Sequence, residues 1–167
     1  MHNKHKLRQY NQSFKRDIEK YRYKEIKKIL IYFRFHSVNE IQDLMNKAKS
    51  LFPAASCSFL MLKENIQKEE TFDINYFSYN DCNILMKPNE SVLQKISNEK
   101  YDVFISLINE NELNFVDENI LVMNNAKIRV GLYLNDKPYC LDVFCDTKSS
   151  SKVEQLQNID TLLRKIN

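Results

Sequence analysis

The sequence of 167 residues predicts one α/β domain with a mixed, mostly parallel sheet, a C-terminal β-hairpin and a closing helix. Apolar runs rich in β-branched and aromatic residues alternate with segments of helical periodicity, which is typical of a sheet covered by helices. Because crossovers in such sheets are right-handed, we expect the first four strands to be largely parallel. The length corresponds to about one domain.

The segment of residues 1–26 is expected to be a basic helical arm ahead of the α/β domain of residues 27–167. A helix over 7–25 is predicted because apolar side chains recur there every three or four residues. They are Leu7, Tyr10, Phe14, Ile18 and Tyr21. Cations occupy the other faces of this predicted helix, which is therefore amphipathic.

The first half of the domain begins with a strand over 27–35, whose sequence KKILIYFRF is apolar for most of its length. Ser37 is expected to cap a helix over 38–51, with Glu40 three residues later as in a capping box. Pro53 ends that helix, and a second strand follows over 56–62. A polar stretch then leads to the remaining elements. These are a strand over 74–79, a helix over 91–98, a strand over 101–108 and a helix over 115–124.

The C-terminal part predicts a β-hairpin and a last helix. Two apolar runs, 127–134 and 139–145, flank the turn-forming residues Asn135-Asp136-Lys137-Pro138. This pair would be antiparallel, so the sheet as a whole would be mixed. A polar linker over 148–151 precedes a helix over 152–166.

Positive charge is concentrated at the N-terminus. Ten of the 25 basic residues and only three of the acidic ones lie in the first 28 residues, which gives this segment a formal charge of +7 and the remainder −4. A field of this sign favours RNA, an anionic membrane surface or an acidic protein. The basic residues are Lys4, Lys6, Arg8, Lys15, Arg16, Lys20, Arg22, Lys24, Lys27 and Lys28.

Aromatic residues interleaved with these cations favour RNA, because phosphates bind Lys and Arg while bases stack on aromatic rings. The aromatic residues are Tyr10, Phe14, Tyr21 and Tyr23. We therefore predict a non-enzymatic binding protein whose arm engages structured RNA or a ribosomal particle. In the other interpretation, the apolar side of the arm docks on the chain's own sheet or on a second copy in a homodimer. A membrane surface is disfavoured because the apolar stripe is narrow.

Several classes of function are excluded or disfavoured. Gly131 is the only glycine, so neither a dinucleotide-binding fingerprint nor a Walker loop can be built, and we expect no cofactor. The four cysteines lack paired spacing, no apolar run could span a membrane, and no secretory signal is evident. These features predict a cytoplasmic protein.

A pocket is conceivable where His36 and Ser37 follow one strand and Asn109 and Glu110 follow another, because α/β sheets bind ligands beyond the carboxyl ends of their strands. A histidine beside a serine and a carboxylate suits a hydrolase. The alternative is that His36 is a polar loop residue and Ser37 a helix cap. No nucleophile elbow exists, so we predict no catalytic residues.

No metal site is predicted. His2 and His5 lack a third ligand, and Cys140 and Cys145 are five residues apart on one predicted strand, so they face opposite sides. Arg34 is a cation within an apolar run. We expect it to form a structural ion pair with Asp102 or Asp142, with an anion contact as the alternative.

The pieces KKILIYF, NILMKPNESVLQKI, YDVFISL, NNAKIRVGLY and PYCLDVF resemble an uncharacterised family of Bacteroidota over residues 1–166. The YDVFI and AKIRVG segments are also similar to the N-terminal Rossmann-like half of heptosyltransferase-type glycosyltransferases, over about residues 27–134. This second resemblance implies a single Rossmann-like domain. It also offers an alternative function, a nucleotide- or nucleotide-sugar-binding domain or enzyme, although the donor-binding second half of those enzymes has no counterpart here.

Overall fold

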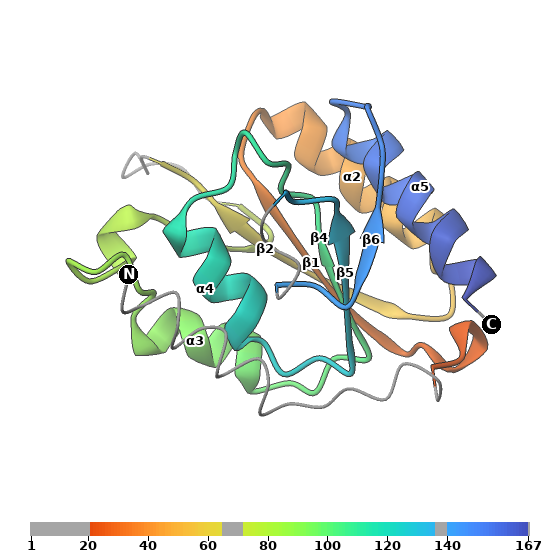
Figure 1. The fold of residues 1–167 in the computed structure, drawn as a ribbon, viewed down its shortest axis with the longest axis horizontal. Helices are drawn as coiled ribbons and strands as arrows, with labels where there is room; N and C mark the ends of the chain where they lie inside the picture. Colours follow the sequence, from red (N-terminus) through yellow and green to blue (C-terminus); the bar gives the residue numbers. More distant parts are fainter. Residues whose placement is uncertain (1–20, 65–71, 136–139, 167) are drawn as a thin grey trace.

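The computed structural model describes residues 21–64, 72–135 and 140–166, in which six parallel strands form one sheet (Figure 1). The strand order is β3-β2-β1-β4-β5-β6, and every neighbouring pair is parallel. This is the strand order of a Rossmann fold. The strands are β1 (Lys28–Arg34), β2 (Ser56–Leu62), β3 (Asn75–Phe77), β4 (Val103–Ser106), β5 (Ile128–Leu132) and β6 (Val143–Cys145).

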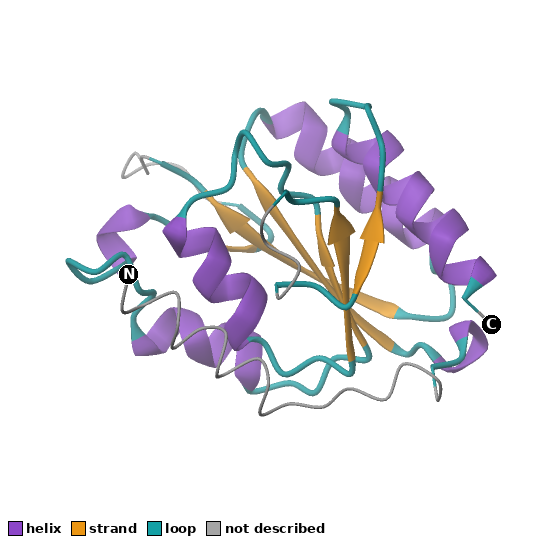
Figure 2. Cartoon of the chain, viewed as in Figure 1, coloured by secondary structure: helices purple, strands orange, loops and turns teal. Residues whose placement is uncertain are grey.

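Helices cover both faces of the sheet (Figure 2). One face carries α2 (Val38–Leu51) and α5 (Lys152–Lys165), and the other carries α3 (Glu90–Ser97) and α4 (Phe115–Met123). Two 3₁₀ turns complete the described elements, η2 (Tyr23–Glu25) and η3 (Tyr79–Asp81). The sequence prediction of an α/β, Rossmann-like architecture is confirmed.

Alternation along β1 explains why the sheet has helices on both sides. Ile29, Ile31 and Phe33 belong to the core beneath α2 and α5, whereas Leu30 and Tyr32 belong to the core beneath α3 and α4. Successive side chains of a strand point to opposite faces, so an uninterrupted apolar run must be buried on both.

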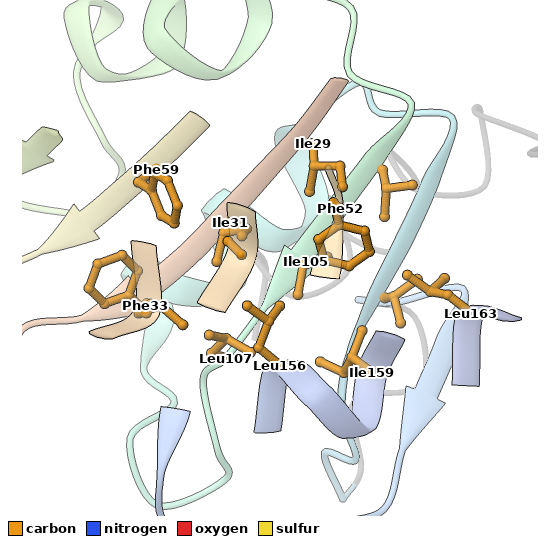
Figure 3. Close-up of a cluster of buried hydrophobic side chains, with 14 of the residues drawn as sticks. Ile29, Ile31, Phe33, Phe52, Phe59, Ile105, Leu107, Leu156, Ile159 and Leu163 are labelled. Carbon is orange, nitrogen blue, oxygen red and sulfur yellow. The ribbon is translucent and has the colours of Figure 1, made fainter. Parts of the chain in front are cut away.

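The core beneath α2 and α5 contains side chains from distant parts of the sequence (Figure 3). Ile105 in β4 and Leu107 just beyond it share one cluster with Leu156, Ile159 and Leu163 of α5. The three α5 side chains are fully buried and recur at helical spacing. Burial of each stabilises the fold by about 1.5–3 kcal/mol, so α5 is an integral part of the domain.

Side-chain caps fix where the helices begin. The Ser37 hydroxyl accepts a hydrogen bond from the Glu40 amide at 3.2 Å, so the predicted cap of α2 is confirmed. Asn114 and Asp117 form a reciprocal capping box at the start of α4. Such caps contribute about 1 kcal/mol each.

The predicted β-hairpin, and with it the mixed sheet, is wrong. β6 pairs with β5 in parallel, with Val130 opposite Val143 and Leu132 opposite Cys145. On either side of residues 136–139, which lie outside the described part, Leu134 and Leu141 are buried in the core beneath α3 and α4. These apolar residues therefore belong to a return across that face of the sheet and not to antiparallel strands.

The predicted N-terminal helix does not extend to residue 25. Arg22 has extended backbone angles, and residues 23–25 form the 3₁₀ turn η2. The reason is tertiary: Tyr23 and the buried Ile26 pack against the core of the domain, which sets the path of the chain into β1. Residues 7–20 of the predicted helix lie outside the described residues.

Candidate functional site

The carboxyl ends of the strands, where an α/β sheet would bind a small ligand, contain a buried ion pair between Lys152 and Glu112. The Lys152 ammonium is 1% exposed and donates to both Glu112 carboxylate oxygens, at 2.9 and 2.7 Å, and to the Leu107 carbonyl at 2.6 Å. Its three donors are thereby satisfied. Burial acts to raise the pKa of Glu112, but hydrogen bonds from the Asn109 amide and Lys152 outweigh it and lower that pKa.

His36 joins this cluster, with Nε2 2.8 Å from Glu112 Oε1. The other predicted pocket residues have structural partners. The Asn109 side-chain oxygen accepts from the Asn111 amide at 3.0 Å and the Glu112 amide at 3.1 Å, and Glu110 accepts from the Asn135 side chain at 2.6 Å.

The structure therefore brings His36 to Glu112 and not to Glu110. Ser37 caps α2, where its hydroxyl oxygen accepts from the Glu40 amide. These contacts hold the loops after β1 and β4 together, and they give Ser37 no base that could activate it as a nucleophile.

Arg34 forms the predicted structural ion pair, but with a different partner. Its Nη2 lies 2.7 Å from Asp117 Oδ2, and the more distant carboxylate of Glu64 is 3.8 Å from Nη1. The fully buried Asp117 also accepts from the Tyr32 hydroxyl at 2.6 Å. Burial, together with the neighbouring Asp117 charge, raises the pKa of Tyr32 well above its usual value.

The two predicted partners of Arg34 are engaged at the opposite end of the sheet. Asp102 accepts from the Lys27 and Lys28 amides at 2.8 and 3.0 Å and pairs with Lys127 at 2.7 Å. Asp142 Oδ1 lies 3.0 Å from Nη2 of the buried Arg129. Both carboxylates therefore stabilise the amino ends of strands.

Residues 21–25, the root of the N-terminal arm, lie against the C-terminus of α5 (Figure 1). The Tyr23 hydroxyl donates to Asp160 at 2.5 Å, and the Arg164 guanidinium is 4.7 Å from the centre of the Tyr23 ring. Burial is the largest cause, and the hydrogen bond to Asp160 the next, of a rise in the pKa of Tyr23 to about 12. An open hollow of about 570 Å³ is lined here by Arg22, Tyr23, Lys24, Glu25 and Arg164.

Four of the predicted arm cations fall in the described residues. Arg22 and Lys24 line the hollow, Lys27 is exposed at its backbone contact with Asp102, and Lys28 pairs with Glu99 at 3.2 Å on the surface. Tyr21 and Tyr23 both pack against the domain core. The remaining predicted arm residues lie outside the described residues. They are Lys4, Lys6, Arg8, Lys15, Arg16, Lys20, Tyr10 and Phe14.

Charge differs between the two ends of the sheet. The described segments at the amino ends of the strands carry nine cations and five carboxylates. The described segments at the carboxyl ends carry five cations and ten carboxylates. The amino-end segments are 21–28, 49–56, 72–75, 97–103, 124–128, 140–143 and 164–166. The carboxyl-end segments are 34–40, 62–64, 77–90, 106–118, 132–135 and 145–154.

Sequence reasoning missed the residues that organise the carboxyl-end segments. Asp117 could have been found as the second half of an Asn-x-x-Asp capping box before an apolar run. No sequence signal pairs Lys152 with Glu112, which lies 40 residues earlier. Within the described part of the chain, no cluster of three or more potential metal ligands is present, and no helix has the length and apolar character needed to cross a membrane.

Comparisons with known proteins give a family and a similar solved structure. The solved structure of the Escherichia coli heptosyltransferase WaaC with ADP is similar, with a TM-score of 0.48 and 9% sequence identity over 83% of this chain. The chain spans about half of that structure, 47% of its length. No curated protein matches significantly. Residues 2–166 match a family of unknown function, DUF6913, and the chain belongs to that family.

Proposed function

We propose that this protein is a non-enzymatic binding protein that engages structured RNA, on its own or in a ribosomal particle, through its basic N-terminal arm and the amino-end segments of the sheet. The observation that carries the proposal is the charge difference between the two ends. The arm, with its excess of cations, enters the domain at the end whose described segments carry nine cations and five carboxylates. The two basic regions can therefore act as one surface.

Helix dipoles account for only part of this charge. Lys49, Arg164 and Lys165 lie in the last turns of α2 and α5, where cations complement helix C-termini. The other six amino-end cations flank the starts of β1, β4 and β5. They are Arg22, Lys24, Lys27, Lys28, Lys100 and Lys127. A nearby patch of this sign attracts polyanions and raises their association rate.

The carboxyl-end segments are poorly suited to the alternative, a nucleotide or nucleotide-sugar ligand. Their excess of carboxylates repels phosphate groups. Three cations there are mostly or fully buried; Lys63 lies over the Phe35 and Phe72 rings, and the other two have carboxylate partners. Arg34 pairs with Asp117, and Lys152 pairs with Glu112. A phosphate at Arg34 or Lys152 would have to displace the paired carboxylate and leave it buried without its counter-ion.

RNA is favoured over other polyanions by the aromatic residues of the arm. Single-stranded loops and bulges are recognised by stacking on aromatic rings or guanidinium planes, together with phosphate contacts from Lys and Arg. A membrane would need a broader apolar face than the sequence of the arm provides.

The proposal is tested by co-sedimentation of the full chain with ribosomes and by its binding to purified ribosomal RNA, each at low and high salt. We expect association at low salt that is lost at high salt, because phosphate contacts release counter-ions. A variant with Gln in place of the six cations of residues 1–20 should lose most of this association. Lys87→Gln and Lys148→Gln remove cations from the carboxyl-end segments and serve as controls.

Failure to associate at low salt would refute the proposal, as would equal association by the six-fold variant and the wild-type chain. A shift in the unfolding temperature on addition of nucleotide sugars, without RNA binding, would favour the alternative instead.

A further inference from the structure

The hollow at the root of the arm combines a stacked cation and ring with two further cations. The Arg164 guanidinium lies over the Tyr23 ring, and its side chain remains 54% exposed. Arg22 and Lys24 line the same hollow, and both are exposed. Its volume of about 570 Å³ lies within the range of small-ligand sites.

Hydrogen bonds to the domain fix the stacked Arg164 guanidinium and Tyr23 ring. Arg164 Nε donates to Asp160 at 2.9 Å, and Nη2 donates to the Leu51 carbonyl at 3.4 Å. Asp160 is buried and accepts from the Tyr23 hydroxyl as well, so one carboxylate orients both members of the stack. A guanidinium with a fixed plane loses less conformational freedom on binding than a mobile one.

These features match one nucleotide of single-stranded RNA. Unstacked bases bind on guanidinium planes, and phosphates bind Lys and Arg. A duplex keeps its bases stacked on one another and offers no free base face. The Glu25 carboxylate, which also lines the hollow, disfavours a phosphate beside it but can accept a hydrogen bond from a base.

We propose that this hollow binds one unpaired base of the RNA partner on the exposed part of the Arg164 guanidinium, with the adjoining phosphates at Arg22 and Lys24. This inference rests on the proposed RNA-binding function and deepens it. It assigns an unpaired loop, bulge or end of the RNA to a particular site in the folded domain.

The test compares an unstructured oligoribonucleotide of about 12 nucleotides with a duplex of the same length, using fluorescence anisotropy and the full chain. Arg164→Lys keeps the charge and the reach to Asp160 but removes the plane. We expect this variant to bind the single strand about tenfold more weakly and the duplex less than twofold more weakly. Equal losses for both, or no loss for either, would overturn the inference while leaving the proposed function intact.

A second measurement uses the wild-type chain alone and so does not depend on the folding of a variant. Ultraviolet crosslinking of the single strand, followed by peptide mass spectrometry, should place crosslinks at Tyr23 or its neighbours in 22–25. Crosslinks confined to other segments would overturn the inference. If the wild-type chain binds neither RNA, the proposed function and the inference fail together.

Discussion

Replacing Asp117 by Asn tests whether Arg34 has a structural role. The substitution keeps the shape of the side chain and an oxygen that can accept from the Tyr32 hydroxyl, which is 2.6 Å away in the wild-type chain. It removes the charge that faces Arg34 at 2.7 Å. Asp117 is fully buried and the Arg34 side chain is 14% exposed, so little water can replace the lost carboxylate.

Breaking a buried ion pair by removing one partner destabilises a protein by about 3–5 kcal/mol. The residual contact to Glu64 at 3.8 Å is solvent-exposed and recovers little of this. Since domains of this size are stable by about 5–15 kcal/mol, Asp117→Asn should lower the urea midpoint strongly at an unchanged m-value.

The matched control is the double variant Arg34→Met with Asp117→Asn, in which no charge is left without a partner. It should recover much of the lost free energy of unfolding, since replacing both members of a buried pair is often close to neutral. A loss below about 1 kcal/mol for Asp117→Asn, or no recovery in the double variant, would refute the structural role of the Arg34–Asp117 pair.

Four further outcomes follow from the structure. Gly131→Ala would place a methyl group 2.8 Å from Leu141 Cδ1 and 3.0 Å from the Ser106 carbonyl oxygen, so urea unfolding should show a loss of about 1–3 kcal/mol; wild-type stability would contradict this packing. The Tyr21 hydroxyl is buried without a hydrogen-bond partner among the described residues, so Tyr21→Phe should leave stability unchanged or raise it by up to about 1 kcal/mol, and a clear loss would reveal a partner. Burial raises the pKa of Cys57 to about 11 from an ordinary value of 9.0, which lowers its thiolate fraction at about pH 8 but makes the thiolate more nucleophilic. Its thiol should therefore react with a disulfide reagent roughly tenfold more slowly than a free thiol, as followed by peptide mass spectrometry; a rate like that of a free thiol would contradict this. The pKa of Glu112 in the folded chain lies below its ordinary 4.5, so its contribution to stability is present above that pH and lost as pH falls through the folded value; Glu112→Gln should therefore narrow the stability difference between about pH 6 and pH 3, and an unchanged difference would contradict the sign.

Sequence patterns predicted those elements whose local signals agree with their packing. The helix over 38–51 has a capping serine, a terminating proline and an apolar face, and α2 has these bounds. The strand over 56–62 ends in the apolar run FLML, which the polar Lys63 and Glu64 follow, and β2 has these bounds. In both cases the local preference and the tertiary environment favour the same structure.

The hairpin failed because apolar periodicity does not distinguish a strand from a buried crossover. Leu134 and Leu141 are as apolar as strand residues, yet they pack beneath α3 and α4 as parts of a return connection. The turn-forming residues between them suit a hairpin and a crossover equally well. Strand direction depends on which edge of the sheet is available, and a single sequence does not contain that information.

The site was predictable in its charges and not in its pairings. The cation at Arg34 within an apolar run signalled an ion pair, but its partner Asp117 comes from a helix 83 residues later. The arm cations were evident from composition, whereas the contact between Tyr23 and Arg164 joins the two ends of the described chain. Such contacts are set by the topology and follow only once the fold is known.

The central claim is that the arm and the amino-end segments bind RNA as one cationic surface, and the salt dependence of affinity tests it most directly. The dissociation constant for ribosomal RNA should be measured from about 50 to 300 mM salt for the wild-type chain and for a variant with Lys24→Gln and Lys27→Gln. We predict a steep, linear fall of log affinity with log salt, and a slope shallower by about one to two in the variant. An affinity that does not change with salt, or the same slope for both proteins, would contradict the claim.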